Sequence, residues 1–169
     1  MKIYIIFLLL LLSITVACEK DNICIEENTP YLIIRFYDYD VPDLYKKAVN
    51  IKVELQGIEG FYEDDGLTIK TLTDSIAIPI KVTEDITRFK ITVSVFDEDE
   101  NLVENEDSFE LYYDRDDIFV SRSCGYKTVY NNVALGLEED DDNWIKIIET
   151  TEDPLNIINQ ISAHVKIFH

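Results

Sequence analysis

The two histidines are the first candidates for chemistry, because histidine is a common base in hydrolases and a common zinc ligand. His164 and His169 lie five positions apart, and on a continuous strand an odd separation places two side chains on opposite faces. They are therefore not expected to bind one zinc ion together. A hydrolase would need His164 in a cleft beside a carboxylate and a hydroxyl. The stretch 121–125 (SRSCG) lacks the glycines of a nucleophile elbow, and we expect no enzymatic activity and no catalytic residue.

Acidic turns are the second candidate site. The stretch 97–108 begins like an EF-hand calcium loop, but Leu102 stands where that loop needs glycine and Ser108 where it needs glutamate. A calcium site of another kind, built jointly by the turns 97–101 and 138–142, stays open as a weak hypothesis. Its candidate ligands are Asp97, Asp99, Asp140 and Asp142. Solvated hairpin tips are the commoner explanation for such turns, so no cofactor is expected.

Aromatic side chains are the third candidate site. Tyr31, Tyr37 and Tyr39 fall on one face of a predicted strand at 31–39, opposite an apolar face. With Trp144 they would form a platform that captures a carbohydrate or a peptide. The alternative is that these rings cover sheet margins or fill a second core layer.

The N-terminal segment has the layout of an export signal. Lys2 supplies a positive charge, and an apolar run follows from Ile3 to Ala17. A helix over this run would span about 22 Å, which is less than the roughly 30 Å hydrocarbon core of a bilayer. Thr15-Val16-Ala17-Cys18 resembles the lipobox of bacterial lipoproteins, although Thr15 stands where leucine is usual. The resemblance implies that residues 1–17 are a signal peptide and that Cys18 is acylated, for example with palmitate; the alternative is ordinary secretion.

The two other cysteines are Cys24 and Cys124. With Cys18 lipidated, export would place this pair in an oxidising compartment, where paired thiols usually form a disulfide. Closing a loop of about 100 residues would contribute up to about 4.7 kcal/mol in the chain-entropy model. The alternative is two buried free thiols.

The net charge of −19 limits the partners. Such a surface repels nucleic acid and anionic head groups, so the expected partners are a membrane, reached through the N-terminal lipid, and another envelope protein. So large a charge can indicate disorder, but 47% of the residues are hydrophobic and they are regularly patterned.

Alternation with period two runs through most of the remaining chain and predicts strands rich in β-branched residues. The clearest segments are 31–39, 49–55, 76–82 and 89–95, and shorter strands are predicted at 67–71, 108–113, 117–123, 126–137, 143–150, 155–158 and 163–168. Turns are predicted at 63–66, 97–101, 114–117 and 138–143, and a helical turn at 43–48 alone. Because Pro79 cannot donate to a ladder, its strand is expected at a sheet edge or at a bulge.

This pattern predicts an all-β fold, an antiparallel β-sandwich of immunoglobulin-like or transthyretin-like type. We expect one domain over 25–169, preceded by a lipidated N-terminus at 18–24.

Several stretches are similar to a family of uncharacterised Bacteroidota lipoproteins, the domain of unknown function 6452. The similarity rests on the stretches CEKDNIC (18–24), TPYLIIRFY (29–37), TDSIAIP (73–79), VSRSCGYKTVYN (120–131), NWI (143–145) and AHVKIFH (163–169). It covers nearly the whole mature chain and implies a one-domain lipoprotein, with no mechanism attached.

We therefore expect a non-catalytic lipoprotein of the bacterial outer membrane that binds or scaffolds an envelope partner. In that phylum, acidic residues soon after the lipidated cysteine resemble a surface-export signal, and residues 19–22 (EKDN) match it in part. The domain would face either the periplasm or the cell surface. Two alternatives are a carbohydrate- or peptide-capturing module and a calcium-stabilised, adhesion-like module.

Overall fold

The computed structural model describes residue 24 and residues 29–55, 67–69, 72–96 and 99–169. The predicted signal peptide, Cys18, the turn at 63–66 and Asp97 lie outside these residues. The described part of the chain forms ten strands and no helix, so it holds no helix able to span a membrane. The strands are β1 (Leu32–Tyr37), β2 (Ile51–Leu55), β3 (Leu67–Ile69), β4 (Ser75–Ile78), β5 (Ile86–Phe96), β6 (Leu102–Ser121), β7 (Gly125–Leu137), β8 (Ile147–Thr150), β9 (Leu155–Ile157) and β10 (Val165–Phe168).

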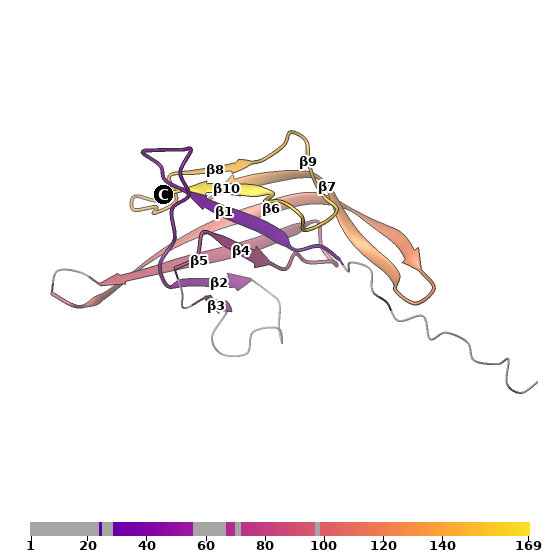
Figure 1. The fold of residues 1–169 in the computed structure, drawn as a ribbon, viewed down its shortest axis with the longest axis horizontal. Coiled ribbons are helices and arrows are strands. Elements are labelled where there is room, and N and C mark those ends of the chain that lie inside the picture. Colours follow the sequence, from indigo (N-terminus) through magenta and orange to yellow (C-terminus); the bar gives the residue numbers. More distant parts are fainter. Residues whose placement is uncertain (1–23, 25–28, 56–66, 70–71, 97–98) are drawn as a thin grey trace, which may run out of the picture.

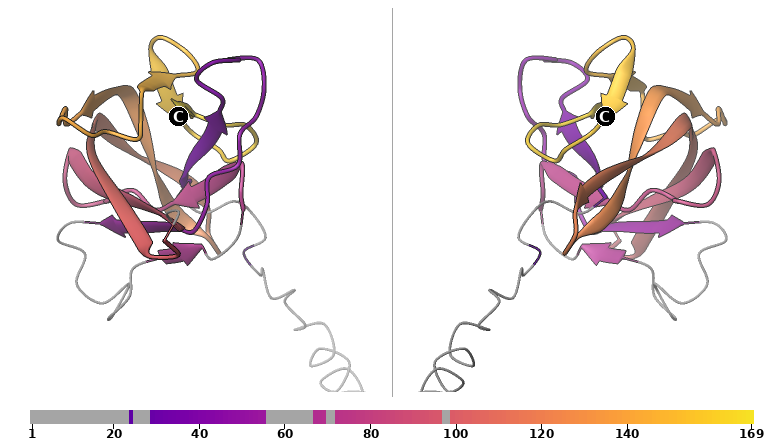
Figure 2. Two further views of the ribbon diagram at one scale, coloured as in Figure 1. Left: turned by 90° about the vertical axis from the view of Figure 1, so that its left-hand side faces the viewer. Right: turned by 90° about the vertical axis from the view of Figure 1, so that its right-hand side faces the viewer.

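The strands form two sheets that pack as a sandwich (Figures 1 and 2). One sheet has the order β4-β1-β10-β8 and the other has the order β3-β2-β5-β6-β7-β9. The predicted all-β sandwich is confirmed. One strand pair departs from the predicted antiparallel arrangement, because β10 enters the smaller sheet between β1 and β8 and runs parallel to β1. Period-two alternation assigns the faces of a strand and carries no information on the direction of its neighbour.

The core lies between the sheets and follows the alternation of the sequence. Leu32, Ile34 and Phe36 of β1 are fully buried, while the residues between them are half-buried on the outer face of the smaller sheet. The larger sheet contributes its own alternating set, in which the rings of Phe89 and Phe109 stack at 5.0 Å. Burial of these apolar side chains is the main driving force for the fold.

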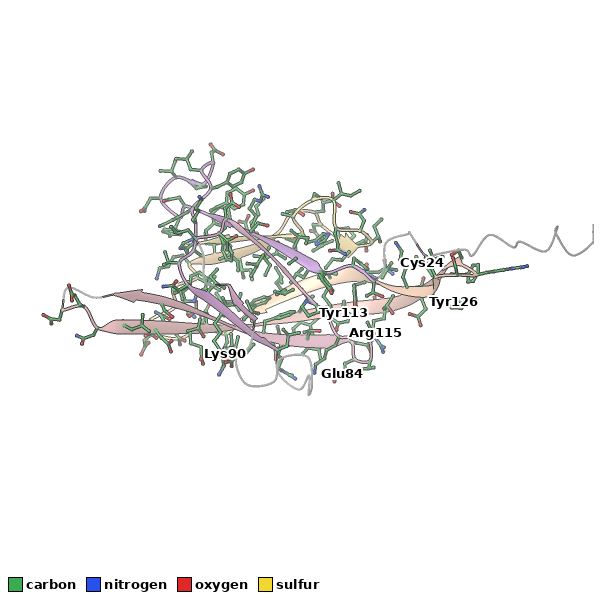
Figure 3. The ribbon with its side chains drawn as sticks, turned by 60° about the horizontal axis from the view of Figure 1, so that its bottom comes forward. Cys24, Glu84, Lys90, Tyr113, Arg115 and Tyr126 are labelled. Atoms are coloured by element: carbon green, nitrogen blue, oxygen red, sulfur yellow. A yellow bond between two sulfur atoms is a disulfide. The ribbon has the colours of Figure 1, made fainter. Side chains whose placement is uncertain are left out.

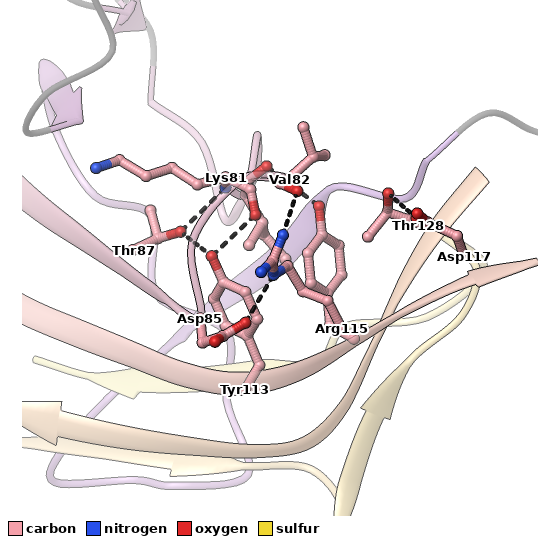
Figure 4. Close-up of polar contacts among 10 residues, drawn as sticks. Lys81, Val82, Asp85, Thr87, Tyr113, Arg115, Asp117 and Thr128 are labelled. Carbon is pink, nitrogen blue, oxygen red and sulfur yellow. Dashed lines mark hydrogen bonds and ion pairs between the residues drawn. The ribbon is translucent and has the colours of Figure 1, made fainter. Parts of the chain in front are cut away.

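β6 is the longest strand, at 20 residues, and it corrects a sequence prediction. The acidic stretch 114–117 was expected to be a turn, but the chain continues through it as a strand, with a β-bulge after Tyr112. Here Arg115 Nε donates to Asp85 Oδ1 at 2.7 Å, and Thr128 Oγ1 donates to Asp117 Oδ1 at 2.8 Å (Figure 4). Partners supplied by other elements therefore allow acidic residues to occupy a strand.

A buried pair of tyrosines fixes the segment after β4 to the larger sheet (Figure 4). Tyr113 OH donates to Lys81 O at 2.9 Å and accepts from Thr87 Oγ1 at 2.6 Å. Tyr130 OH donates to Ile80 O at 3.1 Å, and the two rings meet edge to face at 4.9 Å. Burial raises the pKa of both hydroxyls, so they stay protonated at neutral pH and act as hydrogen-bond donors.

Two smaller predictions have different outcomes. Pro79 directly follows β4, which is an outermost strand of its sheet, as expected for a residue that cannot donate to a ladder. The segment 43–48 forms no helical turn. Instead Tyr45 and Ala48 form isolated bridges to Tyr37 and Thr73.

The predicted disulfide is present in the structure and joins Cys24 to Cys124, with Cα atoms 4.9 Å apart. Cys124 lies in the turn between β6 and β7, so the bond fixes the beginning of the described chain to the tip of this long hairpin (Figure 3). Nearby, Thr128 N donates to Thr29 Oγ1 at 3.0 Å. The start of the domain is therefore held against one end of the larger sheet.

We expect the double variant Cys24→Ser/Cys124→Ser to fold with the same secondary structure and to lose up to about 4.7 kcal/mol of stability. This is the chain-entropy value for a loop of about 100 residues. Urea unfolding of the oxidised wild type and of the variant measures the difference. Wild type reduced under native conditions is the control and should approach the variant; equal stability of all three would contradict the prediction.

Candidate functional site

His164 has a structural environment. The side chain is buried, and its Nδ1 accepts a hydrogen bond from the main-chain N–H of Ile33 at 3.0 Å. The main-chain N–H of His164 donates to Ile33 O at 2.8 Å. Burial lowers the pKa of the ring, while a hydrogen bond to the main chain of Asn159 raises it. The ring is therefore a neutral imidazole whose proton sits on Nε2 and whose lone pair on Nδ1 is already used.

An open depression of about 240 Å³ lies beside this histidine and is lined in part by Glu152 and Ser162. A carboxylate and a hydroxyl thus lie in the same depression as His164, which is the arrangement that a hydrolase would need. Because the acceptor nitrogen of His164 is bonded to Ile33, the ring has no lone pair with which to take a proton from Ser162. In this arrangement His164 is therefore not placed to act as the base for Ser162.

Trp144 and His169 close the sandwich near the end of β1 and take part in the core. Trp144 Nε1 donates to Ile91 O at 3.2 Å, and its ring lies 6.4 Å from the buried Phe36 ring. The His169 ring meets both of these rings edge to face, and Lys46 Nζ donates to the His169 main-chain oxygen at 2.7 Å. The structure therefore does not bring Trp144 into a surface platform.

The acidic loop after β7 is organised by its own hydrogen bonds. Asp140 Oδ1 accepts from Asp142 N at 3.0 Å, and Asn105 Nδ2 donates to Asp142 O at 2.6 Å. Among the described residues, no group of three His, Cys, Asp or Glu side chains could hold a metal ion. Asp99 lies in the turn before β6, and Asp97 is outside the described part. The calcium hypothesis gains no ligand set from this geometry.

Asp107, which sequence reasoning passed over, lies beneath the same loop. It is fully buried, and its Oδ2 accepts the N–H of Ile145 at 2.7 Å. Burial raises the pKa of the carboxyl, against the lowering effect of that bond and of hydrogen bonds to Asn143 and Trp144. The Oδ1 atom is buried without a hydrogen bond from any described residue. Asp107 thus fixes the loop that places Trp144.

The three predicted tyrosines are spread along the smaller sheet. Tyr31 precedes β1 and Tyr37 ends it, so their Cα atoms are separated by six residues, or about 20 Å. Tyr39 lies in the next loop and is exposed. Tyr37 and Tyr39 therefore lie near the C-terminal end of β1, and Tyr31 lies at its N-terminal end. The four predicted residues do not form one platform.

A different cluster forms around Tyr37 on the outer face of the smaller sheet, and we call it the ring–cation face. Its members are Arg35, Tyr37, Tyr45, Lys166 and Phe168. Tyr37 lies beside Phe168 in the parallel register, with ring centroids 5.3 Å apart, and its ring is 5.1 Å from that of Tyr45. The Arg35 guanidinium carbon is 4.8 Å from the Tyr45 ring, and Lys166 Nζ is 5.8 Å from the Tyr37 ring. Both distances are those of cation–π contacts.

The ring–cation face carries two cations in a chain of net charge −19. Most of the other described cations in close polar contacts are paired with carboxylates, as Arg88 is with Glu110 and Lys90 with Glu106. Neither Arg35 nor Lys166 has such an ion pair among the described residues, and Arg35 Nε lacks a hydrogen-bond partner. Glu149 of β8 lies opposite Lys166 in the β8–β10 ladder, and Arg35 Nε is a buried atom, so the face carries positive charge that no close ion pair among the described residues neutralises.

The loop from Asp38 to Leu44 extends this face with exposed apolar side chains. Asp38 Oδ1 accepts from Asp40 N at 2.8 Å and from Val41 N at 3.1 Å, and Asp38 N donates to Leu44 O at 2.9 Å. These bonds fix the loop. They hold the exposed side chains of Tyr39, Val41 and Leu44 beside the ring–cation face.

Sequence reasoning found Tyr37 and Tyr39 and missed Arg35, Tyr45, Lys166 and Phe168. Arg35 was visible as the one charged residue on the tyrosine side of the 31–39 strand. Lys166 and Phe168 come from a strand more than 120 residues away that pairs in parallel. The alternation of the sequence does not encode that pairing.

We expect the substitution His164→Gln to destabilise the protein less at pH 5.5 than at pH 7.5. Burial lowers the pKa of His164 in the folded protein, so the unfolded wild type binds protons more readily as the pH falls below 6.5. Glutamine does not titrate, yet its oxygen can accept the Ile33 N–H. Urea unfolding at both pH values measures this. Burial also lowers the pKa of His169, so His169→Gln is a second variant for which we expect the same direction of pH dependence.

Comparison within each pH isolates the histidine from other groups. Burial raises the pKa of Asp107, so this residue makes the folded protein more stable as the pH falls, which is opposite to the effect of His164. The contribution of Asp107 is the same in wild type and variant and cancels in their difference. A stability difference between wild type and His164→Gln that is the same at both pH values would contradict the neutral state of His164.

Comparisons with known proteins give a family and no function. No curated protein matches the chain, and no solved structure matches it. The model of a family of unknown function, DUF6452, matches residues 53–169, which is well over half of the chain. The matched region contains His164, Cys124 and β10 with Lys166, whereas β1, with Ile33 and Arg35, precedes it. The chain belongs to the family of unknown function DUF6452.

Proposed function

We propose that this chain is a non-catalytic, lipid-anchored binding protein of the bacterial envelope, and that its ring–cation face holds a partner protein. The observation that carries the proposal is a pair of cations, Arg35 and Lys166, that make cation–π contacts and no close ion pair among the described residues, next to the exposed side chains of Tyr45 and of the loop 39–44. In a strongly acidic protein, such a face provides both charge and apolar area for a ligand.

The anchor is proposed from the sequence at Cys18. A positive residue, an apolar run and a small residue before the cysteine support lipidation, and lipidation supports residence at the outer membrane. The domain would then face the periplasm or the cell surface.

The proposed anchor and the ring–cation face would lie at different ends of the domain. The disulfide holds Cys24 at the β6–β7 turn, and β1 runs from that end toward Tyr37 (Figure 1). A partner could therefore reach the face without displacing the lipid.

The chemistry of the face favours a protein segment that carries carboxylates next to apolar side chains. Guanidinium and ammonium groups pair with carboxylates, and aromatic rings and arginine are enriched at protein interfaces. A sugar would need a ring face to stack on. The Tyr37 and Tyr45 rings are tilted by 55° to each other, and Arg35 lies over Tyr45, so no flat double platform forms. These contacts favour a peptide or protein over a carbohydrate.

We expect Cys18→Ala to abolish lipidation and to leave the protein uncleaved or released from membranes after washing with alkaline carbonate. Labelling with an alkyne analogue of palmitate, followed by fractionation of the membranes, measures both. The variant Cys24→Ala/Cys124→Ala is the matched control, because it removes cysteines without touching the lipobox. Acyl label that persists in Cys18→Ala would contradict the anchor.

We expect a photocrosslinking residue at Tyr39 to capture a defined envelope protein, and Arg35→Gln to reduce the yield several-fold. Removing a charge-assisted contact of about 1.5–3 kcal/mol corresponds to roughly a tenfold or greater loss of affinity. Arg88→Gln is the matched control, because Arg88 lies on the other sheet and pairs with Glu110.

Two results would contradict the proposed interface. One is an equal yield from Arg35→Gln, Arg88→Gln and wild type, and the other is equal capture from a crosslinker at the exposed Ile161, which lies outside the ring–cation face. Turnover of an envelope polymer by the purified protein would contradict its non-catalytic nature.

A further inference from the structure

The tip of the β6–β7 hairpin carries exposed apolar side chains that nothing in the domain covers among the described residues. Phe119 is 54% exposed and Tyr126 is 70% exposed, and Ile118 is 42% exposed on the opposite face of the ribbon. Phe119 and Tyr126 are directly paired across the two strands, and their rings meet edge to face at 5.4 Å. The hairpin therefore projects a pair of rings into solvent at one end of the molecule (Figure 3).

The tip has a defined structure. The Ser121 hydroxyl oxygen accepts from Cys124 N at 3.1 Å, and Gly125 adopts a φ of +74°, which favours glycine. The disulfide at Cys124 adds a covalent constraint. Little conformational entropy would therefore be lost when the rings are placed in a new environment.

The same tip is the point of the domain closest along the chain to the proposed lipid. Cys24, bonded to Cys124, is six residues after Cys18, and a fully extended chain of that length reaches at most about 20 Å. The tip of the hairpin, with Phe119 and Tyr126, would be held within that reach of the bilayer. Figure 3 places Cys24 beside Tyr126.

From residue 118 to residue 127 the hairpin carries two cations and no carboxylate, which is compatible with a membrane surface, whereas the segment 19–27 around Cys24 holds four acidic residues. Arg122 is exposed in the turn, and Lys127 follows Tyr126 on β7. The nearest carboxylate on β6, Asp117, accepts a hydrogen bond from Thr128 at 2.8 Å. Tyrosine side chains are enriched where hydrocarbon meets head groups, because the ring is apolar and the hydroxyl is polar.

We propose that the β6–β7 tip inserts Phe119 and Tyr126 into the interfacial region of the phospholipid bilayer that holds the acyl chains of Cys18. This inference rests on the proposed lipidation. The tip gives the domain a second, non-covalent contact with its membrane and fixes its orientation, with the ring–cation face directed away from the bilayer.

The test uses the lipidated full-length protein in phosphatidylcholine vesicles whose acyl chains carry bromine, which quenches tryptophan on contact. Tyr126→Trp and Phe119→Trp each add a reporter at the tip, and Tyr39→Trp is the matched control at the opposite end of β1. Trp144, which packs against the core, is the reporter in the wild type. We expect both tip variants to lose emission intensity and to shift to shorter wavelength, and the control and wild type to do neither.

The outcomes separate the two proposals. Flotation with vesicles and the mass of the N-terminal peptide report lipidation independently of fluorescence. If the protein is lipidated and floats but tip reporters are quenched no more than Tyr39→Trp, tip insertion is refuted and the anchor stands. If Cys18 carries no acyl chain, both proposals are overturned.

Discussion

The register of β6 with its two neighbours is the constraint on which the rest of the structure depends. Its first half pairs with β5 and its second half with β7, and the two pairings overlap only around Phe109 to Tyr112. At about 3.3 Å per residue, a strand of this length spans about 66 Å. The strand therefore carries the core residues at its middle and sets the two hairpin turns far apart. A slip of one residue would turn Phe109 and Leu111 outward and bring Glu110 into the core.

The paired side chains along β6 explain how so acidic a strand is tolerated. Arg115 donates a hydrogen bond to Asp85. The hydroxyls of Tyr113 and Tyr130 donate to main-chain oxygens of the segment after β4 and hold that segment against the larger sheet. These contacts connect the edge of the smaller sheet with the middle of the larger one. The position of β4, and through it of β1 and the ring–cation face, therefore depends on polar contacts as well as on the apolar core.

The sequence was sufficient to predict the elements whose faces differ in polarity, and insufficient where long-range partners decide. The alternation of β1, β2 and β5, the all-β class and the Cys24–Cys124 pair could all be predicted. The strand through 114–117 could not, because the partners Asp85 and Thr128 lie elsewhere in the chain. For the candidate site, Tyr37 and Tyr39 were accessible from the pattern. The place of Trp144 in the core depends on a loop held by the buried Asp107, which no local pattern indicates.

The outermost strands of both sheets are short: β4 and β8 have four residues each, and β3 and β9 have three. A short outermost strand offers few unpaired main-chain groups to another molecule. With the proposed lipid anchor, copies on one membrane would diffuse in two dimensions, share an orientation and meet far more often than copies in free solution. Short edges would then keep crowded neighbours from joining their sheets, so that each copy stays available to the proposed partner.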